Sequence, residues 1–272
     1  MSIYRNVVWF MKGLQEYTKS GYEAAATRFA PGDMDVNLSG RSFMITGGNS
    51  GIGKSAALEI ASRGGTVHMV CRNKERAEAA KTDIIEHSKN QNVHVHVVDM
   101  SRARQVWEFA QRFTQNNNLH VLINNAGCMV NQRELTGEGL EKNFATNTLG
   151  TYILTTALIP ALKTAEDPRV ITVSSGGMLV QKLNVDDLQF EKGTFDGTMA
   201  YAQNKRQQVI LTERWASQHK EIHFSSMHPG WADTPDRKAV ATHLPLAFSR
   251  STPQEEEKLQ ATLEQLADKF KP

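Results

Sequence analysis

The stretch Thr46-Gly47-Gly48-Asn49-Ser50-Gly51-Ile52-Gly53 decides the fold of this 272-residue chain. It follows an apolar run, residues 42–46, with the pattern of a strand, and it leads into a segment of helical periodicity, residues 53–62. A sharp turn from strand to helix needs residues without a Cβ, and the glycines of the stretch supply them. A purely structural turn would use glycine too, so the rest of the chain must decide what the turn does.

Short β-branched runs alternate with longer helical stretches from residue 39 onward. The predicted strands cover residues 42–46, 66–71, 93–98, 121–124, 170–174 and 222–227. The predicted helices between them cover residues 53–62, 74–88, 103–114, 138–163 and 201–218. This alternation predicts an α/β protein with three layers, in which helices cover both faces of a doubly wound parallel sheet. In such a Rossmann fold the ligand lies at the carboxyl ends of the strands.

Composition fits a folded globular chain, with 40% hydrophobic and 22% charged residues. The 31 Lys and Arg residues and the 29 Asp and Glu residues leave a net charge of +2, too small a basic field for a nucleic-acid binder. Two cysteines, Cys71 and Cys128, are too few for a disulfide framework and favour a reduced, intracellular compartment. No apolar run approaches the roughly 18 residues of a membrane-spanning helix.

The chain divides into three expected segments: a helical extension over residues 1–38, a sheet domain over 39–234, and a short C-terminal segment with its own helix over 235–272. In the extension, apolar residues recur at helical spacing, namely Ile3, Val7, Phe10, Met11 and Leu14. This helix packs either on the protein's own surface or a partner, or on a membrane surface. We therefore expect an intracellular protein, either cytoplasmic or peripherally membrane-associated.

The position of the glycine-rich turn, after the first strand and before the first crossover helix, favours a dinucleotide cofactor. Gly47 allows the tight turn, Gly51 a close approach of the backbone to a pyrophosphate, and Gly53 close packing of helix on strand. The N-terminus of the helix would then face the negative charge of the pyrophosphate.

The end of the second predicted strand favours NADP over NAD. An NAD site usually places an acidic residue there for the ribose 2′-hydroxyl, whereas this chain has Cys71-Arg72-Asn73. Arg72 suits a 2′-phosphate, with Lys74 and Arg76 as weaker candidates; the alternative is a solvated arginine in a loop. Asp99, after the third strand, either accepts from the adenine amino group or caps the next helix.

Tyr201 and Lys205 stand four residues apart on a predicted helix, so that their side chains share one face. A nearby ammonium stabilises a phenolate and lowers the pKa of the phenol, which makes tyrosine usable as a proton donor and base. The fifth predicted strand ends in Ser174-Ser175, where a hydroxyl can bond a substrate carbonyl. A hydrolase role for this serine is disfavoured, because the Gly-x-Ser-x-Gly elbow is absent.

At this point the chain resembles the short-chain dehydrogenase/reductase family over roughly residues 38–234. The matching residues, in order, are the turn from Thr46 to Gly53, Asn124-Asn125-Ala126-Gly127, Asn147, Ser175, Tyr201 with Lys205, and His228-Pro229-Gly230. The resemblance implies a Rossmann fold and an alcohol or carbonyl substrate, and it makes a homodimer an option.

The resemblance also implies a role for each catalytic residue. Ser175 orients and polarises the carbonyl, in preference to Ser174. Tyr201 protonates the alkoxide as hydride arrives. Lys205 binds the nicotinamide ribose and depresses the pKa of Tyr201, and Asn147 holds a water that relays protons to Lys205. Cofactor contacts are implied for the turn residues Thr46, Gly47, Asn49, Ser50, Gly51, Ile52 and Gly53, and for Arg72, Asp99, Asn125, Ala126, Gly127, Tyr201, Lys205, Pro229, Gly230 and Thr234.

The C-terminal part departs from the family pattern, because only 38 residues follow Thr234. A terminal helix takes part of them: Thr252 can cap it, Pro253 suits its first turn, and an apolar stripe follows at Leu259, Leu263, Leu266 and Phe270. We therefore expect the seventh strand and the substrate helix to be missing or reduced, as in a splice variant of a longer protein. Such a form would fold less stably and reduce its substrate poorly.

The sequence thus predicts an NADP(H)-dependent oxidoreductase that acts on a small or lipid-like alcohol or carbonyl. A catalytically weak nucleotide-binding or interaction protein is the alternative. A nucleotide-sugar epimerase or dehydratase would use the same Tyr and Lys but needs a larger C-terminal domain. His94 and His96 share one face of a strand, but two ligands do not make a metal site, so we expect no metal.

Overall fold

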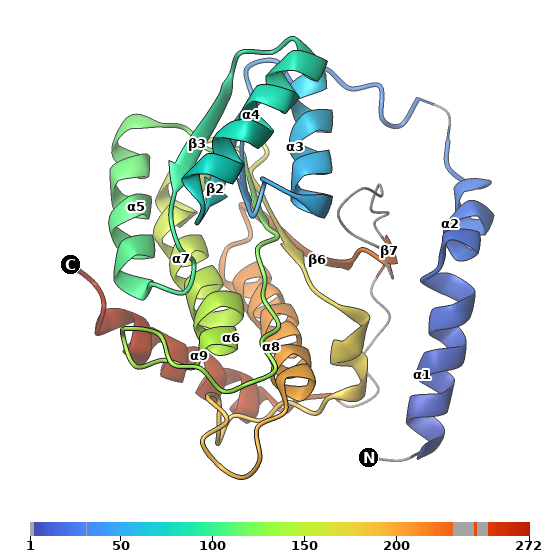
Figure 1. Ribbon diagram of the computed structural model, residues 1–272, viewed down its shortest axis with the longest axis vertical. Helices are drawn as coiled ribbons and strands as arrows, with labels where there is room; N and C mark the ends of the chain where they lie inside the picture. The colour runs from blue at the N-terminus through green and yellow to red at the C-terminus, as the bar shows by residue number, and fades with distance from the viewer. Residues whose placement is uncertain (1–2, 31, 231–241, 244–249) are drawn as a thin grey trace.

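The computed structural model describes residues 3–30, 32–230, 242–243 and 250–272. Its seven strands form one sheet in the order β3-β2-β1-β4-β5-β6-β7 (Figure 1). The strands are β1 (Ser42–Thr46), β2 (Thr66–Cys71), β3 (Val93–Val97), β4 (Val121–Asn124), β5 (Arg169–Val173), β6 (His223–His228) and β7 (Thr242–His243). The first six pair in parallel, which confirms the predicted fold class, and β7 pairs antiparallel with the end of β6.

Successive residues of the central strands face opposite layers, because side chains alternate along a strand. Met44 belongs to a core with residues of α5 (Ala103–Asn116), α7 (Gly150–Lys163) and α8 (Gly197–Gln218). Its neighbour Ile45 belongs to a second core with residues of α3 (Gly51–Ser62) and α4 (Lys74–Ser88). The two cores lie on opposite faces of the sheet. The sheet and the helices on its two faces therefore form the three predicted layers.

One predicted helix, residues 138–163, is wrong at its start. The chain first forms α6 (Lys142–Phe144) and then a π-helix, η1 (Ala145–Leu149), before α7. Glu141 caps α6, since its carboxylate accepts hydrogen bonds from the backbone N–H groups of Asn143 and Phe144. Glu138 lies outside the helix, and its carboxylate accepts from the backbone N–H of Ala103 at the start of α5.

The other helices follow the prediction with small shifts at their ends. Helix α8 begins four residues earlier than predicted, because Asp196 caps it by accepting from the backbone N–H groups of Thr198 and Met199. The terminal helix α9 (Pro253–Asp268) has the predicted cap, and Thr252 and Glu255 form a reciprocal capping box. Leu259 and Leu263 are fully buried in the same core as α5, α7 and α8, so this helix completes one layer of the domain.

Within the described residues the seventh strand covers Thr242 and His243, which pair with His228 and Met227. The shortening of the C-terminal part stays a prediction. The predicted domain boundary at Thr234, and the segment from which the substrate helix was expected to be missing or reduced, fall largely outside the described residues.

The N-terminal extension forms two helices, α1 (Ile3–Glu16) and α2 (Lys19–Ala26), that run along one side of the molecule (Figure 1). Trp9 and Tyr17 on this segment face the domain, and Tyr17 is 3% exposed. The opposite side of α1 is exposed and apolar, with Val7, Phe10, Met11 and Leu14 at its surface. None of the described helices has the length and hydrophobicity that a bilayer crossing requires.

Candidate active site

The glycine-rich turn joins β1 to α3 with a backbone that needs glycine. Gly47 has a φ of +70°, and a Cβ on Gly53 would lie 2.4 Å from the carbonyl oxygen of Gly47. The Thr46 hydroxyl accepts hydrogen bonds from the backbone N–H groups of Asn125 and Ala126, at 3.0 and 2.9 Å. Asn125 in turn donates from its side chain to the carbonyl of Thr46. These bonds lock the turn to the end of β4.

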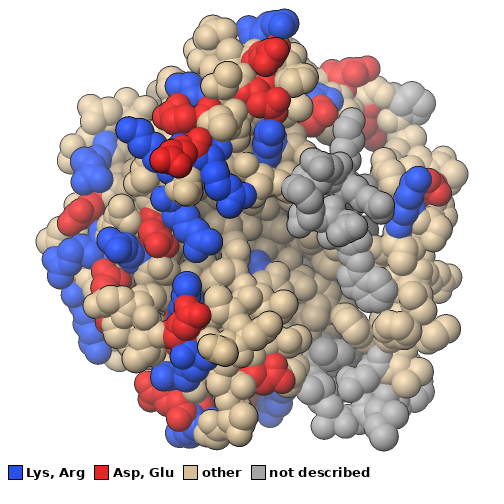
Figure 2. All heavy atoms as spheres, viewed as in Figure 1, with Lys and Arg blue, Asp and Glu red and all other residues tan. Residues whose placement is uncertain are grey.

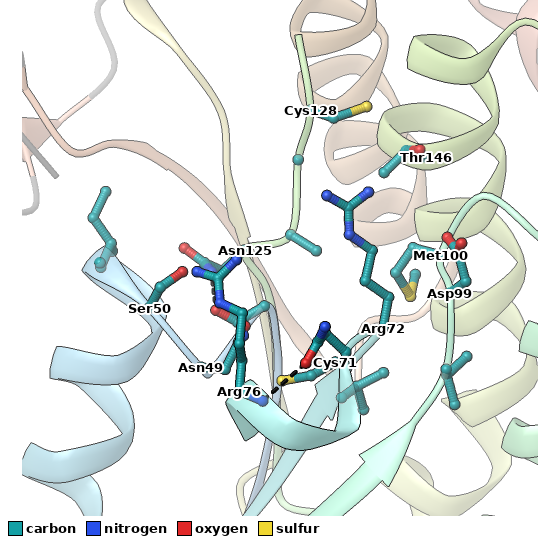
Figure 3. Close-up of a pocket in the computed structure, with 18 residues that line it drawn as sticks. Asn49, Ser50, Cys71, Arg72, Arg76, Asp99, Met100, Asn125, Cys128 and Thr146 are labelled. Atoms are coloured by element: carbon teal, nitrogen blue, oxygen red, sulfur yellow. Dashed lines mark hydrogen bonds between the residues drawn. The ribbon is translucent and has the colours of Figure 1, made fainter. Parts of the chain in front are cut away.

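A pocket of about 310 Å³ opens at this edge of the sheet (Figure 3). Ser50, the residue before α3, makes no side-chain hydrogen bond to the helix, so the first N–H groups of α3 point to the pocket without a side-chain cap. Of the predicted cofactor residues, the pocket is lined by Gly47, Asn49, Ser50, Gly51, Ile52, Arg72, Asp99, Asn125, Ala126 and Gly127. A turn free of side chains beside an uncapped helix N-terminus fits the pyrophosphate of a dinucleotide.

Two arginines, Arg72 and Arg76, project into this pocket from the end of β2 and the start of α4 (Figure 3). Lys and Arg side chains also gather on the rim of the central hollow in Figure 2. Among the described residues that line the pocket, Asp99 is the one carboxylate, and its oxygen accepts from the backbone N–H and the hydroxyl of Ser101. The adenine contact of Asp99 stays a prediction, as does the role of Arg72.

Asn147 lies in the π-helix η1 and is fully buried. Its side chain makes two hydrogen bonds of 2.8 Å with Cys128: it accepts from the backbone N–H and donates to the carbonyl. A Cβ on Gly127 would lie 3.3 Å from the Asn147 side-chain oxygen and 3.5 Å from the Nζ of Lys205. The π-turn and this glycine bring the segment after β4 close to α8, and π-turns of this kind are frequent at functional sites.

Lys205 stands on the inner face of α8 and is 2% exposed. Its Nζ donates to the carbonyl of Val173 at 2.8 Å and to the side-chain oxygen of Gln208 at 3.1 Å. The same Nζ lies 5.4 Å from the centroid of the Tyr201 ring. Burial lowers the pKa of Lys205 to about 8, and the nearby Cys128 thiol opposes this shift only in part.

Ser175 and Tyr201 meet at the carboxyl end of β5. Burial raises the pKa of Tyr201, the Cys128 thiol acts in the same direction, and a hydrogen bond with Ser175 lowers it. The hydroxyl of Ser175 caps η2 (Gly176–Val180) by accepting from the backbone N–H of Gly177. Ser174, by contrast, is buried and donates to the carbonyl of Lys205. The structure thus brings Ser175, Tyr201 and Lys205 together and directs Ser174 elsewhere.

Residues of the N-terminal extension contact the segments next to this group. The indole N–H of Trp9 donates to the carbonyl of Gly176, the residue after Ser175, at 2.8 Å. The Tyr17 ring meets the His228 ring edge to face, with centroids 4.5 Å apart. A Cβ on Gly230 would lie 3.1 Å from the Tyr17 carbonyl oxygen. From the sequence, no site role was assigned to Trp9 or Tyr17. The one available signal was that neither aromatic residue belongs to the apolar stripe of the N-terminal helix.

Six described residues that were predicted to contact a cofactor do not line the pocket at the glycine turn, namely Thr46, Gly53, Tyr201, Lys205, Pro229 and Gly230. Pro229 and Gly230 follow β6, next to the Tyr17 contact, and Thr234 is outside the described residues. Gln208, which bonds Lys205, was not singled out from the sequence, because a glutamine on a helix carries no signal of what it contacts.

His94 is exposed and its ring stacks on His68, whereas the half-buried His96 packs against His68 and Phe113. Burial lowers the pKa of His68 to about 3 and that of His96 to about 4, so these rings stay neutral. Across the described residues, no three His, Cys, Asp or Glu side chains are placed to hold a metal ion.

Comparison with known proteins matches residues 41–244 to the short chain dehydrogenase family. The human dehydrogenase/reductase SDR family member 12 is 59% identical, and the alignment covers all of both chains. This alignment has 317 positions, 45 more than the 272 residues of this chain, so those positions hold no residue here. Human retinol dehydrogenase 12 is 37% identical over 72% of this chain and 63% of its own length.

Solved structures show the same fold. A protein from Mycobacterium paratuberculosis is 29% identical and superimposes with a TM-score of 0.71 over 85% of this chain and 95% of its own. A short-chain dehydrogenase from Escherichia coli is 23% identical, with a TM-score of 0.60 over 71% of this chain and 78% of its own.

Proposed function

Because this chain belongs to the short-chain dehydrogenase/reductase family, whose members are oxidoreductases that bind NAD(P), we propose that it interconverts an alcohol and a carbonyl on a lipid-like molecule with NADP(H) as cofactor. The observation that carries the proposal is the convergence of Ser175, Tyr201 and Lys205 at one edge of the sheet, next to a pocket built around a glycine turn. The bound cofactor supplies or accepts the hydride.

The residues present fit a dinucleotide with a 2′-phosphate. The glycine turn leaves room for a pyrophosphate, and the N-terminus of α3 faces it. Arg72 follows β2 where an acidic residue would favour the plain ribose, and its guanidinium suits a phosphate. Lys205 would hold the nicotinamide ribose, while Pro229 and Gly230 would flank the nicotinamide.

The proton comes from the protein's own side chains. The Tyr201 hydroxyl donates its proton to the substrate oxygen during reduction and accepts it back during oxidation. The Lys205 ammonium stabilises the phenolate that forms, and the Ser175 hydroxyl hydrogen-bonds the substrate oxygen and orients it. Burial strengthens each of these interactions, because water does not screen them.

A lipid-like substrate is supported by relatives and by α1. The relative named retinol dehydrogenase 12 acts on a lipid alcohol by its name. In this chain, Val7, Phe10, Met11 and Leu14 form an exposed apolar surface on α1, which fits a peripheral contact of an intracellular enzyme with a membrane.

Liposome co-sedimentation tests the membrane contact. The parent chain should sediment with vesicles of phosphatidylcholine and phosphatidylserine, whereas a Phe10→Ser/Met11→Ser double variant should stay in the supernatant. Leu135→Ser removes an exposed apolar side chain outside α1 and serves as the control. A parent chain that does not sediment contradicts the contact.

The reaction is tested with Tyr201→Phe, which removes the proton donor and keeps the ring. NADPH oxidation with all-trans-retinal should fall by about a hundredfold or more, since positioned acid catalysis contributes that much. NADPH affinity, measured by fluorescence titration, should stay within about twofold. Equal turnover of Tyr201→Phe and an active parent would exclude Tyr201 as the proton donor.

The second candidate is a nucleotide-binding protein with weak catalysis, which the 45 alignment positions without a residue in this chain favour. It predicts NADPH binding without turnover across a panel of aliphatic, retinoid and steroid carbonyls. If the parent chain turns over any carbonyl of that panel and Tyr201→Phe does not, the protein is an oxidoreductase and the second candidate is excluded.

A further inference from the structure

We propose that Gln208 is a positioning residue for the proposed reaction: its amide fixes the Lys205 ammonium by joining it to the backbone carbonyl of Asn147. The inference rests on the proposed function, in which Lys205 supports Tyr201.

The amide of Gln208 spans the space between two predicted catalytic residues. Its oxygen accepts from the Nζ of Lys205 at 3.1 Å, and its nitrogen donates to the carbonyl oxygen of Asn147 at 2.6 Å. Gln208 is 1% exposed, so water does not compete for either bond. The family resemblance assigns the link between Asn147 and Lys205 to a water, and in this chain the side chain of Gln208 makes that link directly.

Lys205 needs such fixing, because a lysine side chain is long and its ammonium is a point charge with three donors. The carbonyl of Val173 takes one N–H and Gln208 takes a second. The titratable groups that face the ammonium are Tyr201 on α8 and Cys128 after β4. From β5 the ammonium bonds the carbonyl of Val173, and from η1 the carbonyl of Asn147 bonds Gln208. The third N–H then remains for the cofactor ribose and the phenol.

The chain offers a matched control in the preceding residue. Gln207 is equally buried, at 1% exposed, and its side-chain oxygen accepts from the Thr148 hydroxyl at 2.7 Å. It therefore also ties α8 to the π-helix, but its side-chain oxygen bonds Thr148 and Asn204 and not Lys205. A general packing role would make Gln207 and Gln208 equivalent, whereas a positioning role makes them differ.

The experiment compares the parent chain with Gln208→Leu, Gln208→Glu and Gln207→Leu. Each protein is labelled with ¹⁵N-lysine, and the Nζ resonance of Lys205, assigned with Lys205→Met, is followed from pH 6 to pH 10. Gln208→Leu should lower the pKa of Lys205, because the ammonium loses an acceptor, and Gln208→Glu should raise it, because the ammonium gains a carboxylate. Gln207→Leu should leave it unchanged.

Turnover with NADPH and all-trans-retinal gives the second readout. At pH 7, Gln208→Leu should lower kcat by about tenfold with less than about threefold change in the KM for NADPH, and Gln207→Leu should change kcat by less than about twofold. If Gln208→Leu does not fold, the upward shift in Gln208→Glu still tests the proposal. An unshifted Lys205 pKa in the folded Gln208 variants overturns it, and so do equal losses of kcat in Gln207→Leu and Gln208→Leu.

Failure of the proposed function has a different signature. If Tyr201→Phe retains turnover, the proposed reaction is wrong whatever the Gln208 variants do. If Tyr201→Phe loses turnover while the Gln208 variants resemble the parent, only the role of Gln208 is wrong.

Discussion

The side of the molecule that we propose to bind the cofactor and the side that we propose to bind the substrate are built differently. Around the glycine turn, β1 is buried along its whole length and is covered by helices of both layers. On the substrate side, β5 and β6 carry half-buried residues such as Ile171 and Ser225, and β7 has two residues. Here the N-terminal Trp9 and Tyr17 contact the site from more than 150 residues away in the chain. The proposed cofactor side is thus assembled from segments of the sheet domain itself, whereas the proposed substrate side also depends on the N-terminal extension.

The largest expected effect lies on the cofactor side, at Gly53. In Gly53→Ala the new Cβ would lie 2.4 Å from the Gly47 carbonyl oxygen and 2.6 Å from the Asn125 side chain, so the turn must open. NADPH affinity should fall by about a hundredfold or more, as measured by fluorescence titration. Gly137→Ala, where a Cβ meets no atom within 4 Å, is the control and should bind as the parent does. Normal binding by Gly53→Ala would show that the turn is not the cofactor site.

The second-largest expected effect, at Arg72, distinguishes the binding of NADPH from the binding of NADH. Arg72→Ala should weaken NADPH binding by about thirtyfold and leave NADH binding unchanged, because the guanidinium bonds a phosphate that NADH lacks. Lys74→Ala, two residues away and outside the pocket lining, should change neither affinity. Parallel calorimetric titrations with both cofactors measure the difference. An equal loss of affinity for NADPH and NADH would contradict the proposal that Arg72 binds the 2′-phosphate.

The pH dependence of carbonyl reduction tests the proposed catalytic roles of Lys205 and Tyr201. Burial lowers the pKa of Lys205 to about 8, so its ammonium is present below that pH and is lost as pH rises. The pKa of Tyr201 is raised, so the phenol keeps its proton over the same interval. We expect kcat for reduction to be constant from pH 6 to pH 7 and about tenfold lower at pH 9. A constant kcat up to pH 10 contradicts a role for the charged lysine.

The smallest effect concerns the substrate side, at Trp9. Trp9→Phe keeps an aromatic ring against η2 but loses the hydrogen bond to the Gly176 carbonyl. We expect kcat to fall by about threefold, because the segment that carries Ser175 loses one of the hydrogen bonds that hold it in place. NADPH affinity should stay unchanged. Val7→Ser, on the exposed side of the same helix, is the control. A loss of NADPH affinity in Trp9→Phe would mean that α1 supports the cofactor side instead.

The sequence predicted those features that depend on neighbouring residues. The positions of the strands, the turn after β1 and the pair Tyr201 and Lys205 follow from periodicity, glycine stereochemistry and spacing within one element. The start of the helix predicted at residue 138 failed because Glu138 and Glu141 are both good caps, and only the fold shows that Glu138 caps α5.

Features of the site that depend on distant contacts could not be predicted. The hydrogen bond from Trp9 to Gly176 joins residues 167 positions apart, and no local pattern records it. The bonds of Gln208 depend on how the π-turn at Asn147 meets α8. The sequence predicted the shortening at the C-terminal end, but it did not indicate that the N-terminal helix packs against the site.

A parallel measurement on this chain and the human dehydrogenase/reductase SDR family member 12 tests the contrast between the two sides most directly. NADPH affinity and single-turnover reduction of all-trans-retinal are compared for the two proteins. If the cofactor side is complete and the substrate side is reduced, both proteins bind NADPH within about threefold of each other, and this chain reduces the substrate at least about tenfold more slowly. Weaker NADPH binding by this chain together with an equal rate of reduction would contradict the account.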